Sequence, residues 1–262
     1  MAEPFVLMSQ DGAVATLSLN RPDKLNALTP RVFVELDAAV DAAIAGGARA
    51  LVLTGTGRFF CSGADIQPDG AGYEGLPDDL GELLRSHYHP FLERLAALDL
   101  PVVTALNGPA AGAGVSLALS GDIVVMGQGG YLLLAFVNIA LVPDAGATWL
   151  VARSAGRARA LEMAMLGDRM PADEAKAAGL VARVVPDNAV LAEAQAIAAR
   201  LAQGPTRALG MIRRQVAFAL DHDFAQALEA EAGNQGDCGR SEDFAEAIAA
   251  LGQKRKPQFR GR

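Results

Sequence analysis

Cysteine and histidine are scarce in this chain. Its 262 residues include three histidines and two cysteines, Cys61 and Cys238. Two cysteines cannot form a disulfide framework or a four-thiolate zinc site, so we expect a reducing compartment and no metal centre. Basic residues are outnumbered as well, because 23 Lys and Arg stand against 30 Asp and Glu and leave a net charge of −7. This balance lacks the broad basic face that a nucleic-acid partner requires.

Long hydrophobic runs are missing too. The apolar stretches are interrupted by Asn, Gly, Pro or Asp before they reach the roughly 18–20 residues of a membrane helix. The N-terminal residues MAEPFVLMSQDG have no basic start and no sustained apolar stretch, so we expect no signal peptide, no membrane contact and a cytoplasmic location. The apolar fraction of 51% excludes a disordered chain, and the length is sufficient for a sizeable core.

The order of predicted elements indicates an α/β fold. Phe5–Met8 and Val14–Leu19 flank Asp11-Gly12 and predict a β-hairpin. Thr29-Pro30 predicts a helix start, and Gly46-Gly47 predicts the end of that helix. Strands and a helix then alternate, which is typical of α/β proteins. The expected strands are Ala50–Leu53, Val102–Leu106, Ile123–Met126 and Tyr131–Phe136, and the expected helix is Ala113–Leu119.

From about residue 145 the pattern becomes helical. Helices are predicted at 145–155, 157–167, 171–179, 191–203, 205–220, 224–235 and 241–252, with Val181–Val185 as the single strand. We therefore expect an α/β core over residues 1–195 and a helical oligomerisation region over residues 196–262. A loop at 67–82, rich in glycine and acidic residues, is expected to shape a ligand pocket.

Two glycine-containing turns follow predicted strands. They are FFCSGADI (59–66) and ALNGPAAGAG (105–114), and their small residues allow a ligand to approach backbone N–H groups. The second turn lacks the Gly-Lys-Ser/Thr ending of a phosphate-binding loop and the order of a dinucleotide fingerprint. Each turn alone is also explained as a simple tight turn.

The two turns belong to a larger set of motifs. The set comprises LNRPDKLNAL (19–28), FFCSGADI (59–66), NGPAAGAG (107–114), SGDIVV (120–125), LVPDAGATWL (141–150) and GDRMPADEAKAAGLV (167–181). In this order and spacing the chain resembles the enoyl-CoA hydratase/isomerase (crotonase) family along its whole length. The resemblance implies a spiral of ββα units, a C-terminal helical trimerisation region, and a homotrimer or a dimer of trimers. It also implies an acyl-CoA thioester as substrate, with no permanently bound cofactor.

The resemblance assigns roles to particular residues. The backbone N–H groups of Ala64 and Ala113 would form an oxyanion hole for the thioester oxygen. The basic tail at 254–262 would reach the coenzyme A of its own or a neighbouring subunit. The expected coenzyme A contacts are Lys24, Leu25, Ala27, Ser62, Ala64, Asp65, Ile66 and Phe259.

The acid/base residues distinguish the members of this family. Its hydratases use two glutamates, and their positions are occupied here by Ser116 and Phe136, neither of which is a useful base. Asp144 stands where the ring-epoxide CoA isomerases of phenylacetate breakdown carry their catalytic aspartate. We therefore expect Asp144 to be the base of an isomerase, with a pKa raised by an apolar pocket that includes Phe136.

Other interpretations of these residues remain open. Asp144 is also placed to cap the helix that follows it. Aryl-CoA dehalogenases of the family use an aspartate here as nucleophile, in which case His89 would be the base and would line the acyl pocket with Ser116 and Phe136. Hydration by a different residue set and a catalytically silent CoA-binding scaffold are the remaining alternatives, and the sequence does not identify the acyl group.

Overall fold

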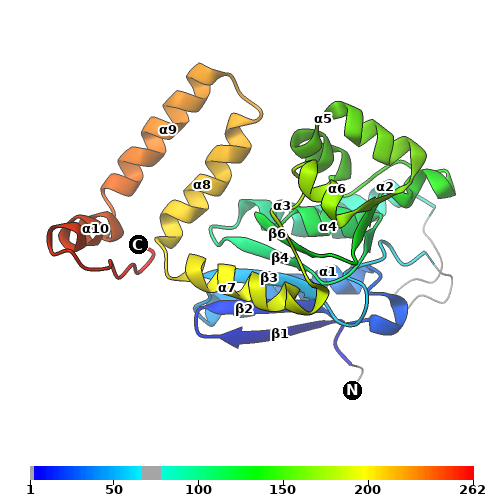
Figure 1. Ribbon diagram of the computed structural model, residues 1–262, viewed down its shortest axis with the longest axis horizontal. Coiled ribbons are helices and arrows are strands. Elements are labelled where there is room, and N and C mark those ends of the chain that lie inside the picture. Colours follow the sequence, from blue (N-terminus) through cyan, green and yellow to red (C-terminus); the bar gives the residue numbers. More distant parts are fainter. Residues whose placement is uncertain (1–2, 67–77) are drawn as a thin grey trace.

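The computed structural model describes residues 3–66 and 78–262. Its centre is a six-stranded sheet in the spatial order β1-β2-β3-β4-β6-β9, parallel except for the β1–β2 pair (Figure 1). Its strands are β1 (Val6–Asp11), β2 (Val14–Leu19), β3 (Ala50–Gly55), β4 (Val102–Leu106), β6 (Ile123–Gly127) and β9 (Arg183–Val185). A small sheet in the order β5-β7-β8 contains β5 (Ala110–Ala111), β7 (Tyr131–Leu133) and β8 (Arg169–Pro171).

The predicted hairpin and the first predicted helix are confirmed. Asp11 pairs with Val14 across the hairpin turn, and Gly12 has a φ of 55°, which favours glycine. Helix α1 (Pro30–Ala45) follows Thr29 and ends at Gly46.

Helices cover both faces of the large sheet. Along β3, Ala50 and Val52 face one core, which they share with residues of α7 (Val190–Ala202). Leu51 and Leu53 belong to the larger core, which also contains the apolar face of α1. The continuous apolar run of β3 is therefore explained by burial on both faces, as parallel strands require.

The other elements before the C-terminal helices are mostly short, and α5 is the longest of them. They are the 3-10 helices η1 (Pro22–Lys24), η3 (Ala135–Ile139) and η4 (Asp187–Ala189), the π-helix η2 (Leu84–Tyr88), and the α-helices α2 (Leu80–Leu83), α3 (His89–Ala97), α4 (Ala113–Leu119), α5 (Ala147–Leu166) and α6 (Ala172–Ala177). Helix α5 is interrupted at Gly156, with φ 80° and ψ 166°, so the two separate helices predicted there are confirmed.

The strand predicted at Tyr131–Phe136 was too long. Strand β7 ends at Leu133 because its partners β5 and β8 are only two and three residues long. The chain turns at Leu134, and Phe136 lies in η3. A short apolar run does not distinguish a strand from a helical turn, which explains the error. Strand β8 was not predicted, and it ends at Pro171, where the helix predicted at 171–179 was expected to begin.

The C-terminal part of the chain is helical. It contains α8 (Thr206–Ala219), α9 (Phe224–Gly239) and α10 (Glu242–Gly252), and α8 and α9 form a hairpin that extends away from the sheet (Figure 1). The expected division at residue 195 falls within α7, which packs on the sheet. The predicted fold class, an α/β core with a helical C-terminal region, is confirmed.

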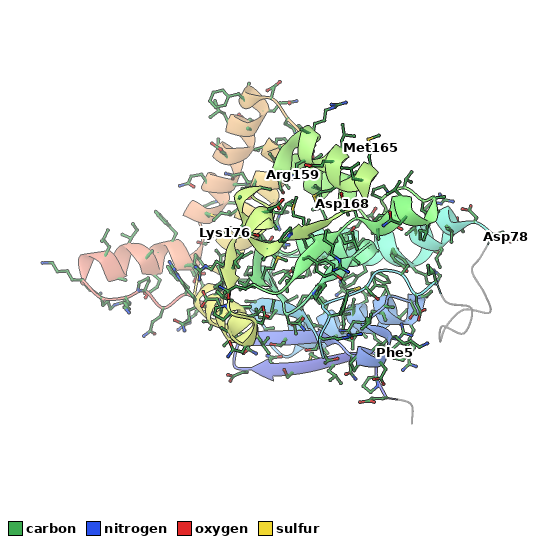
Figure 2. The ribbon with its side chains drawn as sticks, turned by 45° about the vertical axis from the view of Figure 1, so that its right-hand side comes forward. Phe5, Asp78, Arg159, Met165, Asp168 and Lys176 are labelled. Atoms are coloured by element: carbon green, nitrogen blue, oxygen red, sulfur yellow. The ribbon has the colours of Figure 1, made fainter. Side chains whose placement is uncertain are left out.

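Large apolar side chains are exposed on the C-terminal helices and on α5. Phe224 is 79% exposed and Val216 58%. Met165, near the end of α5, is 67% exposed and projects from the surface in Figure 2. Among the described residues, no helix is both long enough and apolar enough to span a membrane.

Candidate active site

The two glycine-containing turns lie side by side beyond the C-terminal ends of β3 and β4. Within the first turn, Ala64 forms a parallel bridge with Leu28, and the bridge bonds involve the carbonyl oxygen of Gly63 and the N–H of Asp65. The N–H of Ala64 itself therefore points to the opposite side of this extended segment. In the second turn, Ala113 is the first residue of α4, where the helix provides no acceptor for its N–H. Within the described part of the chain, neither N–H group donates a hydrogen bond.

Glycine allows the two turns to approach closely. Gly63 has a φ of 95°, and a methyl group on it would lie 2.9 Å from the carbonyl oxygen of Ala111 and 3.4 Å from Cα of Gly112. Gly112 has a φ of 52°, and a methyl group on it would lie 3.8 Å from Cζ of Phe136. Gly63 and Gly112, the residues directly before Ala64 and Ala113, are thus in backbone contact, so Ala64 and Ala113 lie on adjacent segments.

Asp144 lies in the loop between η3 and α5. Burial in a largely apolar environment raises the pKa of its carboxyl group from 3.8 to about 6, although a hydrogen bond from its own backbone N–H lowers it. Its Oδ1 atom is buried and has no hydrogen-bond partner among the described residues. A buried carboxylate oxygen without a partner is costly for a structural group and is common at reactive sites.

A cavity of about 320 Å³ connects Asp144 with the first turn. We call it the Asp144 cavity, and its lining residues are Ala64, Asp65, Ile66, Leu80, Leu83, Leu84, Tyr88, Ile139, Leu141 and Asp144. Most of these side chains are aliphatic, so the carboxylate of Asp144 faces a space suited to an apolar group. This cavity therefore joins a carboxylate of raised pKa to the backbone of Ala64.

A second cavity, of about 410 Å³, lies on the other side of Ala64. This Lys24 cavity is lined by Asp23, Lys24, Leu25, Ala27, Ser62, Ala64, Asp65 and Ile66. It contains every predicted coenzyme A contact except Phe259. Ala64, Asp65 and Ile66 line both cavities, so the two cavities adjoin along this segment.

Comparison with known proteins identifies the family. Residues 9–262 match the enoyl-CoA hydratase/isomerase family. The chain belongs to this family. It is 39% identical to 1,2-epoxyphenylacetyl-CoA isomerase of Escherichia coli, over 98% of this chain and 99% of that protein. It is 43% identical to a Rhodobacter capsulatus protein named "Probable enoyl-CoA hydratase", over 95% of each chain. The crystal structure of an enoyl-CoA hydratase subunit from Geobacillus kaustophilus matches with a TM-score of 0.90 and 37% identity, over 98% of each chain.

In this member of the enoyl-CoA hydratase/isomerase family, a buried ion pair joins the first two motifs. Arg21 donates through Nη2 to the Asp65 carboxylate at 2.8 Å and through Nη1 to the carbonyl oxygen of Ala27 at 2.6 Å. Both side chains are almost fully buried. The predicted ligand contact Asp65 is thus bound to Arg21 and fixes the segment that carries Ala64.

We predict that Arg21→Met lowers the free energy of unfolding by about 3–5 kcal/mol, because it removes the guanidinium from a buried ion pair with Asp65. Arg31→Met is the matched control. The guanidinium groups of Arg21 and Arg31 both lie over the Phe5 ring. The ion pair of Arg31 with Glu35, however, is partly exposed and contributes at most about 1 kcal/mol. Urea unfolding of both variants measures the difference, and equal losses would contradict a dominant role of the Arg21–Asp65 pair.

The structure does not bring Phe259 to either cavity of its own chain. The Phe259 carbonyl oxygen accepts a hydrogen bond of 2.9 Å from Arg49, which precedes β3, whereas Ala64 follows the other end of that strand. A six-residue strand spans about 20 Å, so Phe259 lies near the N-terminal end of β3 and Ala64 lies beyond its C-terminal end.

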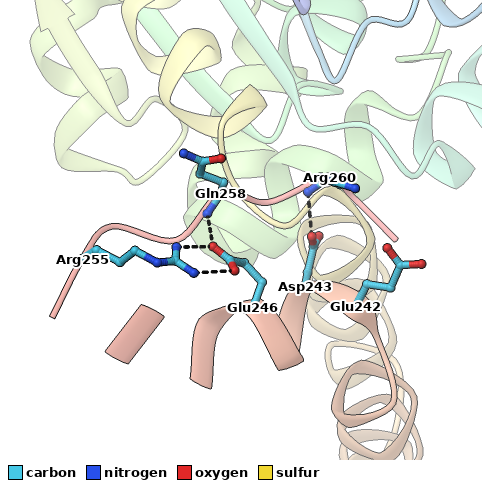
Figure 3. Close-up of a pocket in the computed structure, with 6 residues that line it drawn as sticks. All are labelled: Glu242, Asp243, Glu246, Arg255, Gln258 and Arg260. Carbon is cyan, nitrogen blue, oxygen red and sulfur yellow. Dashed lines mark hydrogen bonds and ion pairs between the residues drawn. The ribbon is translucent and has the colours of Figure 1, made fainter. Parts of the chain in front are cut away.

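The basic tail is held on α10 (Figure 3). Glu246 accepts from Arg255 and from the N–H of Gln258, which holds the pKa of Glu246 at about 2. Asp243 accepts the N–H groups of Arg260 and Gly261.

The three predicted acyl-pocket residues, Ser116, Phe136 and His89, are not among the described residues that line the Asp144 cavity, so the apolar surroundings of Asp144 come from other side chains than the predicted Phe136. Ser116 is fully buried on α4 and contacts the Asp144 backbone, and Phe136 is buried beside Gly112. His89 is half-buried and is not among the lining residues, whereas its neighbour Tyr88 is. Tyr88 was not predicted. It is fully buried in η2 and packs on Phe33 at a ring-centre distance of 4.3 Å.

Most of the predicted loop at 67–82 lies outside the described residues.

Proposed function

We propose that this protein is an acyl-CoA isomerase that shifts a double bond, or rearranges a ring-derived acyl group, through a thioester enolate. The observation that carries the proposal is the buried Asp144 carboxyl group, with a pKa near 6 and an unpartnered Oδ1, in the cavity that also contains Ala64. A base of this pKa is suited to both accepting and returning a proton near neutral pH.

The reaction needs one carboxylate and two N–H groups. Asp144 removes a proton from the α- or γ-carbon of the acyl group, and the electron pair moves to the thioester oxygen. The N–H groups of Ala64 and Ala113 stabilise this oxyanion. Asp144 then returns the same proton at another carbon, so the double bond has moved and no atom is gained or lost. Each oxyanion donor contributes about 3–4 kcal/mol to barrier lowering in enzymes of this kind.

Coenzyme A is proposed as part of the substrate rather than as a resident cofactor. Its pantetheine arm would pass through the Lys24 cavity, with Leu25, Ala27, Ser62 and Ile66 as contacts, and Lys24 would supply a cation for the phosphates. Phe259 would reach coenzyme A only from a neighbouring subunit. We propose a homotrimer or a dimer of trimers, supported by the exposed apolar side chains of α8 to α10.

The acyl group is proposed to be apolar and uncharged. None of the described side chains that line the Asp144 cavity is a cation, and Asp65, the other carboxylate in the lining, is bound by Arg21. Residues 67–77 contain no basic residue either. A carboxylate at the far end of an acyl group would therefore lose its hydration with no compensating charge.

The alternatives differ in the residues they need. A two-glutamate hydratase mechanism is disfavoured because Ser116 and Phe136 occupy the expected positions. Dehalogenation with His89 as base is disfavoured because Tyr88 rather than His89 is among the described lining residues. Hydration by Asp144 alone and a silent CoA-binding scaffold remain possible outcomes of the assay below.

An assay of four thioester classes tests the proposal. The purified protein is incubated with a 3-enoyl-CoA, a 2-enoyl-CoA, the phenylacetate-derived ring-epoxide CoA thioester and a halobenzoyl-CoA. We expect isomerisation of the first or third substrate. Rapid hydration of the 2-enoyl-CoA without isomerisation, or halide release, would assign a different reaction, and binding without turnover would indicate the scaffold.

The pH dependence of turnover provides a second check. Because Asp144 acts as a base only when deprotonated, kcat/KM is expected to rise about tenfold per pH unit below its pKa and to level off above pH 6. The measurement is kcat/KM of the best substrate between pH 4.5 and 8, with a wild-type unfolding control at each pH. A rate that is flat across pH 5 to 7 would contradict Asp144 as the base.

A further inference from the structure

The side chain of Ser116 reaches the loop that carries Asp144. Ser116 is fully buried in α4, and its hydroxyl donates a 3.0 Å hydrogen bond to the carbonyl oxygen of Asp144. The same carbonyl oxygen accepts a 2.9 Å bond from the N–H of Ala147 at the start of α5. The Asp144 backbone is therefore held between two helices.

The backbone around Asp144 needs such support. Ala145 and Gly146 follow it with φ values of 50° and 86°, and Ala140 precedes the loop with φ 58°. Alanine disfavours this left-handed conformation, so the loop adopts it only while its surroundings hold it there. The hydrogen bond from Ser116 is one of the contacts that do so.

Helix α4 also begins with Ala113. Ser116 lies three residues after Ala113, about one helical turn along the same rigid element. One short helix thus provides an N–H group at the proposed oxyanion position and a hydroxyl that fixes the Asp144 loop.

We propose that Ser116 is a positioning residue. Its hydrogen bond to the Asp144 carbonyl oxygen holds the Asp144 loop, and with it the carboxylate, in position for proton transfer. The inference rests on the proposed function. Ser116 does not touch the substrate. Removal of its hydroxyl leaves Ala147 as the remaining donor and lets the loop move toward solvent.

The test compares Ser116→Ala with Ser120→Ala. Ser120 lies one turn further along α4, and its hydroxyl donates to the carbonyl oxygen of Ser116 at 2.8 Å rather than to the Asp144 loop. We expect Ser116→Ala to lower kcat by about 10–100-fold with little change in KM, because small misplacements of a catalytic group are costly. Ser120→Ala is expected to keep kcat and KM within about twofold of the wild type. The half-buried hydrogen bond of Ser120 does not contact the Asp144 loop, so its loss affects stability rather than rate.

The pH profile separates positioning from a merely structural role. Besides Asp144, the titratable groups on the described elements that line the Asp144 cavity are Asp65, which pairs with Arg21, Asp79 and Glu82, which both pair with Arg85, and His87 and Tyr88 of η2. On α5, which packs on η3, Arg153 pairs with Asp221. These pairs remain intact in Ser116→Ala. If the carboxylate gains water, the acidic limb of kcat/KM shifts from about pH 6 toward the ordinary aspartate value of 3.8. Loss of stability alone would leave that limb in place.

Further variants keep the outcomes distinct. Ser116→Cys retains a weak donor of similar size, and it is expected to fall between the wild type and Ser116→Ala; it also replaces Ser116→Ala in the comparison if that variant does not fold. If Asp144→Asn retains turnover, the proposed function is wrong. If Asp144→Asn is inactive while Ser116→Ala matches Ser120→Ala in kcat and pH profile, the positioning role alone is overturned.

Discussion

Asp144→Asn is expected to reduce isomerase kcat by about 10³-fold or more, since a positioned general base contributes roughly 10²–10⁴-fold. The amide has nearly the same shape as the carboxylate but accepts no proton at neutral pH. The unpartnered Oδ1 of the wild type also means that the substitution breaks no protein hydrogen bond at that atom. We therefore expect Asp144→Asn to fold normally and to bind the acyl-CoA with a similar KM.

Measurement of kcat, KM and thermal unfolding for Asp144→Asn checks this combination. Asp173→Asn is the matched control, because Asp173 is an exposed aspartate in the first turn of α6 and lines neither cavity. The control is expected to keep wild-type kinetics. The structure does not support the interpretation of Asp144 as a helix cap, because the N-cap residue of α5 is Gly146 and no side chain caps that helix among the described residues. A kcat of Asp144→Asn close to that of the wild type would contradict Asp144 as the base.

Predicted site residues that lie close together in the sequence also line one cavity in the structure. The Lys24 cavity collects seven of the expected contacts, which lie in two continuous motifs, 19–28 and 59–66. Short motifs fix local backbone shape, so residues within them stay together once the strand order is known.

Two glycines of the second turn are required for different reasons. Gly112 adopts a positive φ, whereas a methyl group on Gly114 would lie 2.6 Å from the Cys61 carbonyl oxygen.

Contacts between distant segments were not predictable in the same way. The Ser116–Asp144 contact joins residues 28 apart through a backbone carbonyl group, which no residue pattern specifies. Tyr88 was missed because its burial depends on packing against Phe33, which lies 55 residues earlier in the chain. His89 was considered because the resemblance to aryl-CoA dehalogenases implies a histidine base there.

The position of the basic tail does not follow from its charge alone. Its five basic residues suited a polyanionic ligand, but acidic residues of α10 provide nearer partners within the chain. Arg255 and the backbone of residues 258–261 are bound by Glu246 and Asp243 before any ligand is present. Composition identifies cations, whereas the fold decides which anions they meet.

Gly63→Ala is expected to lower kcat by about 10²–10³-fold, comparable to the loss of one oxyanion donor. The added methyl group would lie 2.9 Å from the Ala111 carbonyl oxygen, which belongs to the backbone and cannot rotate away as a side chain would. The two turns must then separate, and the N–H groups of Ala64 and Ala113 move apart with them. Because oxyanion donors act at 2.7–3.1 Å, a separation of a few tenths of an ångström weakens at least one bond.

Gly47→Ala is the control that separates catalysis from backbone strain. Gly47 has a φ of 79°, close to the 95° of Gly63. A methyl group on Gly47 would meet no atom within 4 Å, and Gly47 lines neither the Lys24 cavity nor the Asp144 cavity. Both variants incur about 1 kcal/mol of conformational cost, whereas only Gly63→Ala should lose turnover. Steady-state kinetics and urea unfolding of the two variants test this difference. A Gly63→Ala enzyme with wild-type kcat would mean that close contact of the two turns is not required for the reaction, and the oxyanion would then have to be held elsewhere.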